Sequence, residues 1–271
     1  MDTETPTTKR KISLNLLGIL ISFSAFTANA TPISTQQLQH NSFVLGVAAR
    51  NAPKYSGSND YKWSTIPIIQ ARLHHFFIDT TKGIGYDLAL DNGLYWEQSL
   101  GYRFKRNDSN SKWGTGSNHL RGMGKIPAAL TTSATIGYQI TPWLWSEITA
   151  TIALNHNQGI TYSPTLAARL PIDKQNMLSS SVRLMMATEH YTQLYYGVNQ
   201  SQSTNSGFAR YNTAGGLYGS QINLQWTHFL SEQLASSVGI SYTRLADKVA
   251  DSQVVQNANQ YAATLAMSYS F

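Results

Sequence analysis

The sequence predicts an all-β fold, a transmembrane antiparallel up-and-down β-barrel of about twelve strands, with ten as the alternative number. Three observations predict it. Segments with an apolar residue at every second position recur, the last such segment ends the chain at Phe271, and the N-terminus has the pattern of an export signal. Successive side chains of a strand point to opposite faces, so this alternation is typical of a wall between lipid and a polar lumen.

The N-terminal region is typical of a secretory signal peptide. Residues 9–11 are basic, residues 12–26 form an apolar run that is too short for a membrane helix, and residues 28–30 are Ala-Asn-Ala. We therefore predict that residues 1–30 are a cleaved signal peptide and that residues 31–41 are a polar periplasmic lead-in. An uncleaved anchor is the alternative, and mass spectrometry of the mature N-terminus separates the two.

Residues 42–271 are predicted to form the barrel. The strands expected from the alternation are 42–50, 63–73, 76–80, 83–90, 94–105, 125–139, 143–156, 160–170, 177–189, 215–228, 234–245 and 259–271. Two features complicate this assignment. Segment 76–80 is short for a span, and Pro67 and Pro164 each remove a ladder hydrogen bond inside a predicted strand. The prolines predict bulges or strand ends.

The lengths of the connections predict the orientation of the barrel. Short turns fall at 91–93, 141–142, 171–173 and 231–233, and long polar connections cover 51–61, 107–124, 190–214 and 247–258. Outer-membrane barrels have short periplasmic turns and long extracellular loops. If the first strand runs outward, all the long connections are extracellular. Residues 195–198 also have strand-like composition, although they fall within a long connection.

The last predicted strand indicates where the protein is located. Apolar residues alternate with Ala, Thr and Ser up to the end of the chain, and the apolar pattern Met267, Tyr269, Phe271, which ends in two aromatics, resembles the C-terminal signal bound by the barrel-insertion machinery. The sequence thus predicts a protein of the bacterial outer membrane. A soluble edge strand is the alternative interpretation of this segment alone.

Composition narrows the function classes. Charged residues make up 13% of the chain, Tyr and Trp number 15 and 6, and there is no Cys. This composition suits aromatic girdles and a lipid-facing band, and it excludes disulfides and thiolate metal sites. The net charge of +6 suits contact with lipopolysaccharide phosphates. We expect no nucleic-acid partner, because no recognition motif accompanies the basic residues.

Few residues are candidates for a metal site or a catalytic site. His74 and His75 are adjacent, but we expect a solvated periplasmic turn rather than a metal site. A rim hydrolase would use His156, Glu189 and His190, yet the sequence shows no nucleophile paired with a base. We therefore predict no catalytic residues, no metal site and no cofactor.

Charged residues on predicted inward faces are the main candidates for a functional lumen. They are Glu97, Arg103, Glu147, Arg169, Arg183 and Glu189. We expect these carboxylates and guanidiniums to pair with each other, since a charge that faces lipid is costly. The alternative is that they line a polar conduit, because most other inward positions are small.

A family resemblance follows from several motifs. After the first predicted strand the pattern P-x-Y-x-G-S-x-x-Y is formed by Pro53, Tyr55, Gly57, Ser58 and Tyr61. Further matches, up to the C-terminal Phe, include Tyr195, Tyr196 and Gly197. With these motifs the chain resembles the MltA-interacting protein (MipA)/OmpV family of outer-membrane proteins over nearly the whole predicted mature chain.

The resemblance implies a non-enzymatic barrel. The family's namesake is a scaffold that bridges a murein lytic transglycosylase and a penicillin-binding protein, and other members are implicated in adhesion, stress responses and small-solute passage. The resemblance thus implies a scaffold or surface interaction protein. A narrow diffusion channel is the alternative, and an outer-rim lipid or peptide hydrolase is the third hypothesis.

Overall fold

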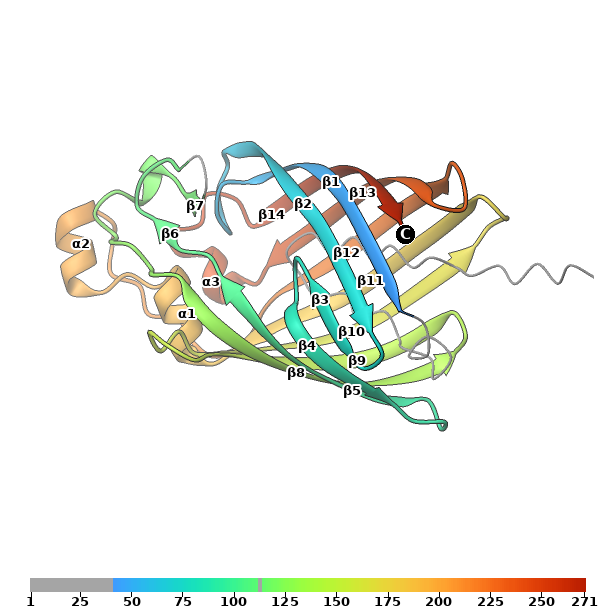
Figure 1. The fold of residues 1–271 in the computed structure, drawn as a ribbon. Coiled ribbons are helices and arrows are strands. Elements are labelled where there is room, and N and C mark those ends of the chain that lie inside the picture. Colours follow the sequence, from blue (N-terminus) through green and yellow to red (C-terminus); the bar gives the residue numbers. More distant parts are fainter. Residues whose placement is uncertain (1–40, 112–113) are drawn as a thin grey trace, which may run out of the picture.

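The computed structural model describes residues 41–111 and 114–271 (Figure 1). The predicted signal peptide and residues 31–40 of the predicted lead-in lie outside these residues. Within the described part of the chain, the polypeptide forms one closed antiparallel barrel of twelve strands. Twelve strands were expected, and the alternative of ten is wrong. The helices and two further short strands lie in the connections.

The wall strands follow the predicted order, and β1 pairs with β14 to close the barrel. Their bounds are β1 Ser42–Pro53, β2 Tyr61–Leu73, β3 Phe76–Asp79, β4 Gly83–Ala89, β5 Leu94–Arg103, β8 Ala129–Thr141, β9 Leu144–Ala153, β10 Ile160–Pro171, β11 Asn176–Ala187, β12 Gly216–Phe229, β13 Leu234–Leu245 and β14 Asn259–Ser270. Every predicted strand is present, with ends that differ by a few residues.

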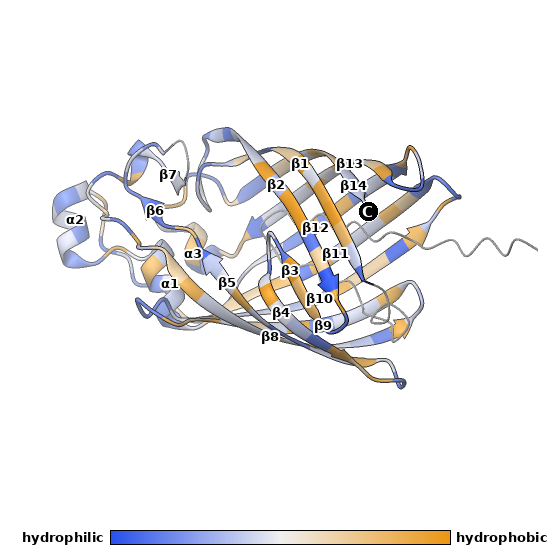
Figure 2. Ribbon diagram, in the orientation of Figure 1, coloured by the Kyte–Doolittle hydropathy of each residue, from blue (hydrophilic) through white to orange (hydrophobic). Residues whose placement is uncertain are grey.

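The alternation in the sequence becomes an apolar outer face and a polar inner face. On β14, Leu265 and Met267 are 52% and 50% exposed, whereas Thr264 and Ser268 are 9% and 2% exposed. Figure 2 shows the same apolar banding along the other strands. Exposed apolar side chains are stable here because hydrocarbon, not water, surrounds the wall. None of the helices among the described residues is long and apolar enough to cross a membrane.

The long connections gather at one end of the barrel, opposite the C-terminus (Figure 1). They contain β6 Arg106–Asn107, β7 Thr115–Gly116, the 3-10 helix η2 Asn118–Leu120, α1 Glu189–Tyr196, α2 Gln200–Ser206 and α3 Asp247–Ala250. We call the described residues of these connections, between β1 and β2, β5 and β8, β11 and β12, and β13 and β14, the loop cap. The strand-like segment 195–198 is wrong as a strand, because Tyr195 and Tyr196 end α1.

One apolar cluster shows how the loop cap is built. Tyr55, Leu120, Met123, Val198 and Val254 are buried against one another. These residues come from all four long connections, which leave the wall at different points around its circumference. Loops that start around a ring can share one core only if they converge over the mouth. The loop cap therefore lies across the extracellular end of the lumen.

Both prolines lie inside wall strands. Pro164 pairs with Ile148 of β9, and the β10–β11 pairing skips Ser163 and Pro164. The register is the same on both sides of this gap, so Pro164 marks neither the bulge nor the strand end that the sequence predicted, and its missing N–H only interrupts the ladder inside β10. Pro67 lies inside β2 and is paired with Val47 of β1 in regular register, so the expected bulge or strand end is wrong there as well.

Candidate functional site in the lumen and the loop cap

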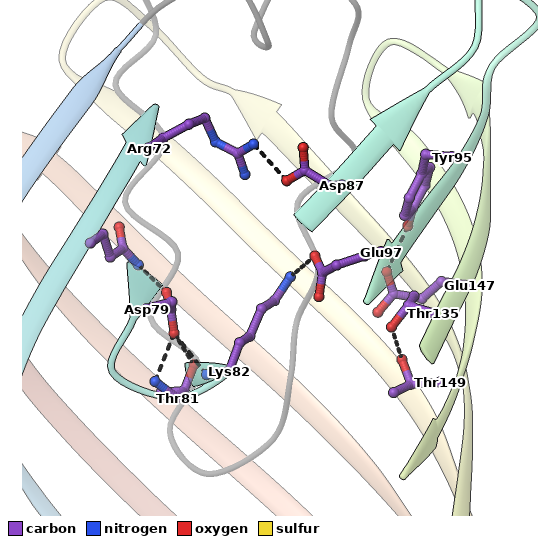
Figure 3. A network of polar contacts seen from close by, with 11 residues as sticks. Arg72, Asp79, Thr81, Lys82, Asp87, Tyr95, Glu97, Thr135, Glu147 and Thr149 are labelled. Atoms are coloured by element: carbon purple, nitrogen blue, oxygen red, sulfur yellow. Dashed lines mark hydrogen bonds and ion pairs between the residues drawn. The ribbon is translucent and has the colours of Figure 1, made fainter. Parts of the chain in front are cut away.

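Two ion pairs lie on the inner face of the wall and join residues of the adjacent strands β2 to β5. Arg72 Nη1 lies 2.5 Å from Asp87 Oδ2, and Lys82 Nζ lies 2.5 Å from Glu97 Oε2. Figure 3 shows each cation pointing to its carboxylate across the short hairpin of β3 and β4. The side chains of Asp87 and Glu97 are 0% and 5% exposed. Buried carboxylates of this kind require a close cation, because an isolated buried charge is strongly unfavourable.

Neutral donors extend this polar network around the wall. The Tyr95 hydroxyl donates to Glu147 Oε2 at 2.6 Å, and the Thr135 and Thr149 hydroxyls lie 2.8 Å apart (Figure 3). Tyr95, Thr135 and Glu147 are all buried. The network therefore connects buried polar groups to one another, so its charges are not isolated.

The predicted luminal arginines are present on the inner face but have different partners from those expected. Arg169 lies over the Trp145 ring at 5.8 Å, and Arg103 lies over the Tyr191 ring at 5.2 Å. Arg183 donates from Nε to Thr165 Oγ1 at 3.3 Å. Glu97 pairs with Lys82 instead of an arginine, and the expected pairing of the other charges with each other stays a prediction.

Glu189 is not a luminal residue. It is exposed and begins α1, since β11 ends at Ala187. The sequence prediction extended the strand too far, because the alternation continues through the residues that precede the helix. A carboxylate in the first turn of a helix is favourable next to the unpaired N–H groups there.

Three luminal residues were missed as site residues. They are Arg72, Lys82 and Asp87. Arg72 and Asp87 lie on the inward faces of their strands, so the alternation itself was a usable signal. Lys82 lies in the turn between β3 and β4, where alternation gives no direction, and only the folded hairpin brings it to Glu97.

The family motif at residues 53–61 holds the loop cap together. The Tyr55 hydroxyl donates to the Val254 carbonyl at 2.9 Å, and the Gln256 N–H donates to the Gly57 carbonyl at 2.7 Å. Gly57 has φ +104°, and a Cβ there would lie 2.9 Å from Val255 Cγ2. Only glycine adopts this conformation without strain, and it also permits the close approach of the last loop.

The other motif residues support the same contacts. Pro53 ends β1, Ser58 is 1% exposed, and the Tyr61 hydroxyl accepts from the Tyr261 N–H at 3.2 Å. Gly197 follows α1 and donates from its N–H to the Gln193 carbonyl at 2.9 Å.

Tyr196 is the buried centre of a second apolar cluster, with Tyr218, Leu245 and Val249. Its hydroxyl lies 2.8 Å from Ser56 Oγ, so one hydrogen bond joins α1 to the first loop. Burial raises the pKa of Tyr196 above its ordinary value, because the phenolate would lose hydration. The hydroxyl therefore stays protonated and available for this bond.

The histidines considered for metal binding or hydrolysis lie in different parts of the fold. His74 and His75 lie in the turn between β2 and β3, and His75 Nδ1 lies 2.9 Å from the Asp87 carbonyl oxygen. His190 Nε2 lies 2.6 Å from the Asn157 carbonyl oxygen, which is a backbone group and not a Ser hydroxyl. Among the described residues, no group of three or more His, Cys, Asp or Glu is arranged to hold a metal ion.

The C-terminal residues lie on the outer face at the end opposite the loop cap. Met267, Tyr269 and Phe271 are 50%, 39% and 70% exposed. Phe271 lies against Phe43 of β1, with ring centroids 5.4 Å apart, and its N–H donates to the Phe43 carbonyl at 2.9 Å. The predicted insertion signal is thus displayed at the seam where the barrel closes.

Comparison with solved structures gives outer-membrane barrels at low identity. The NanC porin is 11% identical, with a TM-score of 0.47, and the match covers 84% of this chain and 98% of that one. The COG4313 channel of Pseudomonas putida F1 is 11% identical, with a TM-score of 0.47 and coverage of 93% and 100%. The P. putida toluene transporter TodX is 10% identical, with a TM-score of 0.41 and coverage of 89% and 92%.

Comparison of the sequence with protein families gives a direct match. No protein with a curated description matches the chain significantly. The model of the family described as MltA-interacting protein MipA matches residues 45–271, which is almost all of the barrel. This chain is therefore an outer-membrane β-barrel that belongs to the MltA-interacting protein MipA family.

Proposed function

We propose that this protein has no catalytic activity of its own and serves as a scaffold for enzymes that synthesise or hydrolyse murein. The family's name describes an interaction with MltA, and the observation that carries the proposal for this chain is the loop cap. A cap with a core contributed by four loops favours a rigid body in the membrane over an open pore.

The periplasmic end is the expected contact surface for such enzymes, because murein lies on that side of the membrane. The wall there ends in short turns, which a rigid barrel holds in fixed positions. The turn at 171–176 is an example, since Asp173 accepts bonds from the Gln175 N–H at 2.7 Å and the Asn176 N–H at 2.8 Å. Lys174 in the same turn is exposed.

A pull-down tests the scaffold. Tagged protein is purified from detergent-solubilised envelopes, and co-purified proteins are identified by mass spectrometry. We expect a murein lytic transglycosylase or a penicillin-binding protein to be recovered. Lys174→Glu in the periplasmic turn should lower recovery, whereas Lys125→Glu in the exposed part of the loop cap should not. Recovery of no envelope protein at all would contradict the scaffold.

A narrow diffusion channel is the second candidate. It is favoured by the small polar side chains of the inner face, such as Ser133 and Thr151, whose hydroxyls lie 2.8 Å apart. Planar-bilayer recordings of the purified protein separate the two functions. The scaffold predicts little conductance for the intact chain, and steady conductance with solute selectivity would support the channel instead.

A hydrolytic activity at the outer rim is the third candidate. The variants His156→Ala and His190→Ala should leave any lipid or peptide hydrolysis by the purified protein at background, as in the wild type. A wild-type activity that both variants lose would overturn the non-enzymatic proposal.

A further inference from the structure

Arg169 lies on the luminal side of the wall, close to the periplasmic end. On its strand β10, Thr165 and Ala167 are 5% and 4% exposed, whereas Leu166 is 48% exposed. Side chains two residues apart in a strand point the same way, so Arg169 points inward with Thr165 and Ala167. β10 ends two residues later, at Pro171, where the chain turns at the end opposite the loop cap.

Trp145 of the neighbouring strand β9 supports the guanidinium group of Arg169. The Arg169 Cζ atom lies 5.8 Å from the centroid of the Trp145 ring, and Trp145 is 4% exposed. Trp145 also forms one buried cluster with Tyr95 and Ala167, which fixes the indole. A guanidinium that lies over a fixed aromatic face loses little further freedom when it binds a ligand. Arg169 is therefore preorganised.

The nitrogen atoms of this guanidinium have different environments. Nε is buried and has no hydrogen-bond partner among the described residues. Nη1 and Nη2 likewise have no partner there, but they are not buried, and the residue as a whole is partly exposed. The edge of the guanidinium that carries Nη1 and Nη2 is thus open to the lumen.

No carboxylate compensates the charge of Arg169 in the part of the chain that the structure describes. None of the ion pairs there includes Arg169. Glu147, a luminal acid on β9, is paired with Thr165, which lies four residues from Arg169 and so about 13 Å away along the strand. A partly buried charge without a counter-ion is unfavourable, and an anionic ligand would remove that penalty.

A free hydroxyl group lies next to Arg169. Ser179 is opposite Arg169 in the ladder of β10 and β11, so their Cβ atoms are about 5 Å apart on the inner face. Within residues 41–111 and 114–271, the Ser179 hydroxyl has no hydrogen-bond partner, and Ser179 is partly exposed. Arg169 and Ser179 thus present neighbouring donors to the lumen without an acceptor.

We propose that Arg169 and Ser179 bind the carboxylate of a small periplasmic solute, with Trp145 as the support of the arginine. The two Nη groups match the two oxygens of a carboxylate in one plane, and the Ser179 hydroxyl donates to one of these oxygens. One cation neutralises a monocarboxylate and leaves a phosphate dianion only partly compensated, which favours the carboxylate. The solute enters from the periplasm, because the loop cap lies over the other end. This site is additional to the scaffold function and does not depend on it.

Ligand-observed NMR on the purified protein in uncharged detergent micelles tests the site. The probes are butyrate and its neutral analogue butyramide at neutral pH, and protein-dependent broadening of their resonances measures binding. We expect broadening for butyrate only. Arg169→Gln should weaken the affinity for butyrate about tenfold, as loss of a charged hydrogen bond predicts. Arg169→Lys should restore only part of the affinity, because an ammonium group lacks the planar fork.

Ser179→Asp gives an independent test that keeps Arg169 in place. The new carboxylate would lie beside Arg169 and occupy its Nη groups. Broadening of butyrate should therefore fall to the level of butyramide, while heat-dependent migration on gels shows that the barrel is folded. This variant decides the proposal even if Arg169→Gln does not fold.

Lys174→Gln is the matched control. It removes one positive charge from the exposed turn at the same end of the barrel and should leave the broadening of butyrate unchanged. Equal broadening of butyrate and butyramide would overturn the proposal. So would undiminished broadening in a folded Arg169→Gln or Ser179→Asp variant, or an equal loss in Lys174→Gln. The pull-down tests the scaffold separately, so the two proposals fail independently.

Discussion

At the scale of single residues, the luminal ion pairs determine how much a buried charge affects the stability of the barrel. Asp87 accepts from Arg72 through Oδ2, while its Oδ1 is buried and has no hydrogen-bond partner among the described residues. Lys82 and Glu97 are likewise removed from bulk solvent, with side chains 12% and 5% exposed. Removing one partner of such a pair destabilises the protein more than the intact pair stabilises it, because the other charge stays buried without a counter-ion.

This asymmetry gives a prediction for Lys82. The variant Lys82→Met should lower the free energy of unfolding by about 3 kcal/mol, because Glu97 would remain buried without its cation. Urea unfolding of the protein in detergent micelles measures the change. The double variant Lys82→Met/Glu97→Gln should recover most of the loss. A double variant as unstable as the single one would show that the charge of Glu97 is not the cause.

Gly57 gives a second prediction at this scale. The variant Gly57→Ala should lower the free energy needed to open the loop cap by about 2 kcal/mol. Residue 57 has a positive φ, and an added Cβ would press on Val255. Limited proteolysis of the loops measures the opening. Gly124→Ala is the matched control, because φ there is +77° and nothing lies within 4 Å of an added Cβ. Equal effects of the two substitutions would rule out the clash.

At the scale of elements, the periplasmic turn at 171–176 depends on one ionised carboxylate. Side-chain hydrogen bonds from Asn176, with the Gln175 N–H, lower the pKa of Asp173 below its ordinary value. A group whose pKa is lower in the folded state stabilises that state above the unfolded pKa, and the contribution is lost as pH falls through the folded pKa.

Acidification should therefore open this turn. Hydrogen exchange at the Gln175 and Asn176 amides should accelerate as pH falls below the usual range of an aspartate, after correction for the intrinsic rate. Asp173→Asn should remove this pH dependence. Protection that stays constant through the acidic range in the wild type would contradict the role of the ionised carboxylate.

The strands were predictable and the loops were not, for a physical reason. A wall strand must place apolar residues on lipid at every second position, so local alternation determines it. Tyr195 and Tyr196 illustrate the opposite case. They belong to a helix because their rings pack on distant partners such as Tyr218, and no local period encodes that contact.

The site shows the same limit. Alternation placed Glu97 and Glu147 correctly on the inner face, but it does not give height along the barrel. Height depends on the stagger between strands, which decides that Glu97 meets Lys82 and that Glu147 meets Tyr95. The pairing of luminal charges therefore required the folded register.

At the scale of the whole molecule, the loop cap lies over one end of the barrel (Figure 1), so we expect it to restrict passage between the lumen and the cell surface. Replacing residues 189–206, which span α1 and α2, with a short Gly-Ser linker should remove Tyr196 and Val198 from the two apolar clusters. We expect the trimmed protein to conduct ions in planar bilayers at a level well above that of the intact chain. Equal conductance of the two proteins would show that the cap does not close the lumen.

The scaffold itself is tested most directly by site-specific photo-crosslinking in living cells. A photoreactive amino acid is placed at Lys174 in the periplasmic turn or at Lys125 in the loop cap, and the crosslinked proteins are identified by mass spectrometry. We predict that a murein enzyme crosslinks at position 174 and not at position 125. Crosslinks to murein enzymes at neither position, or equally at both, would contradict a periplasmic scaffold.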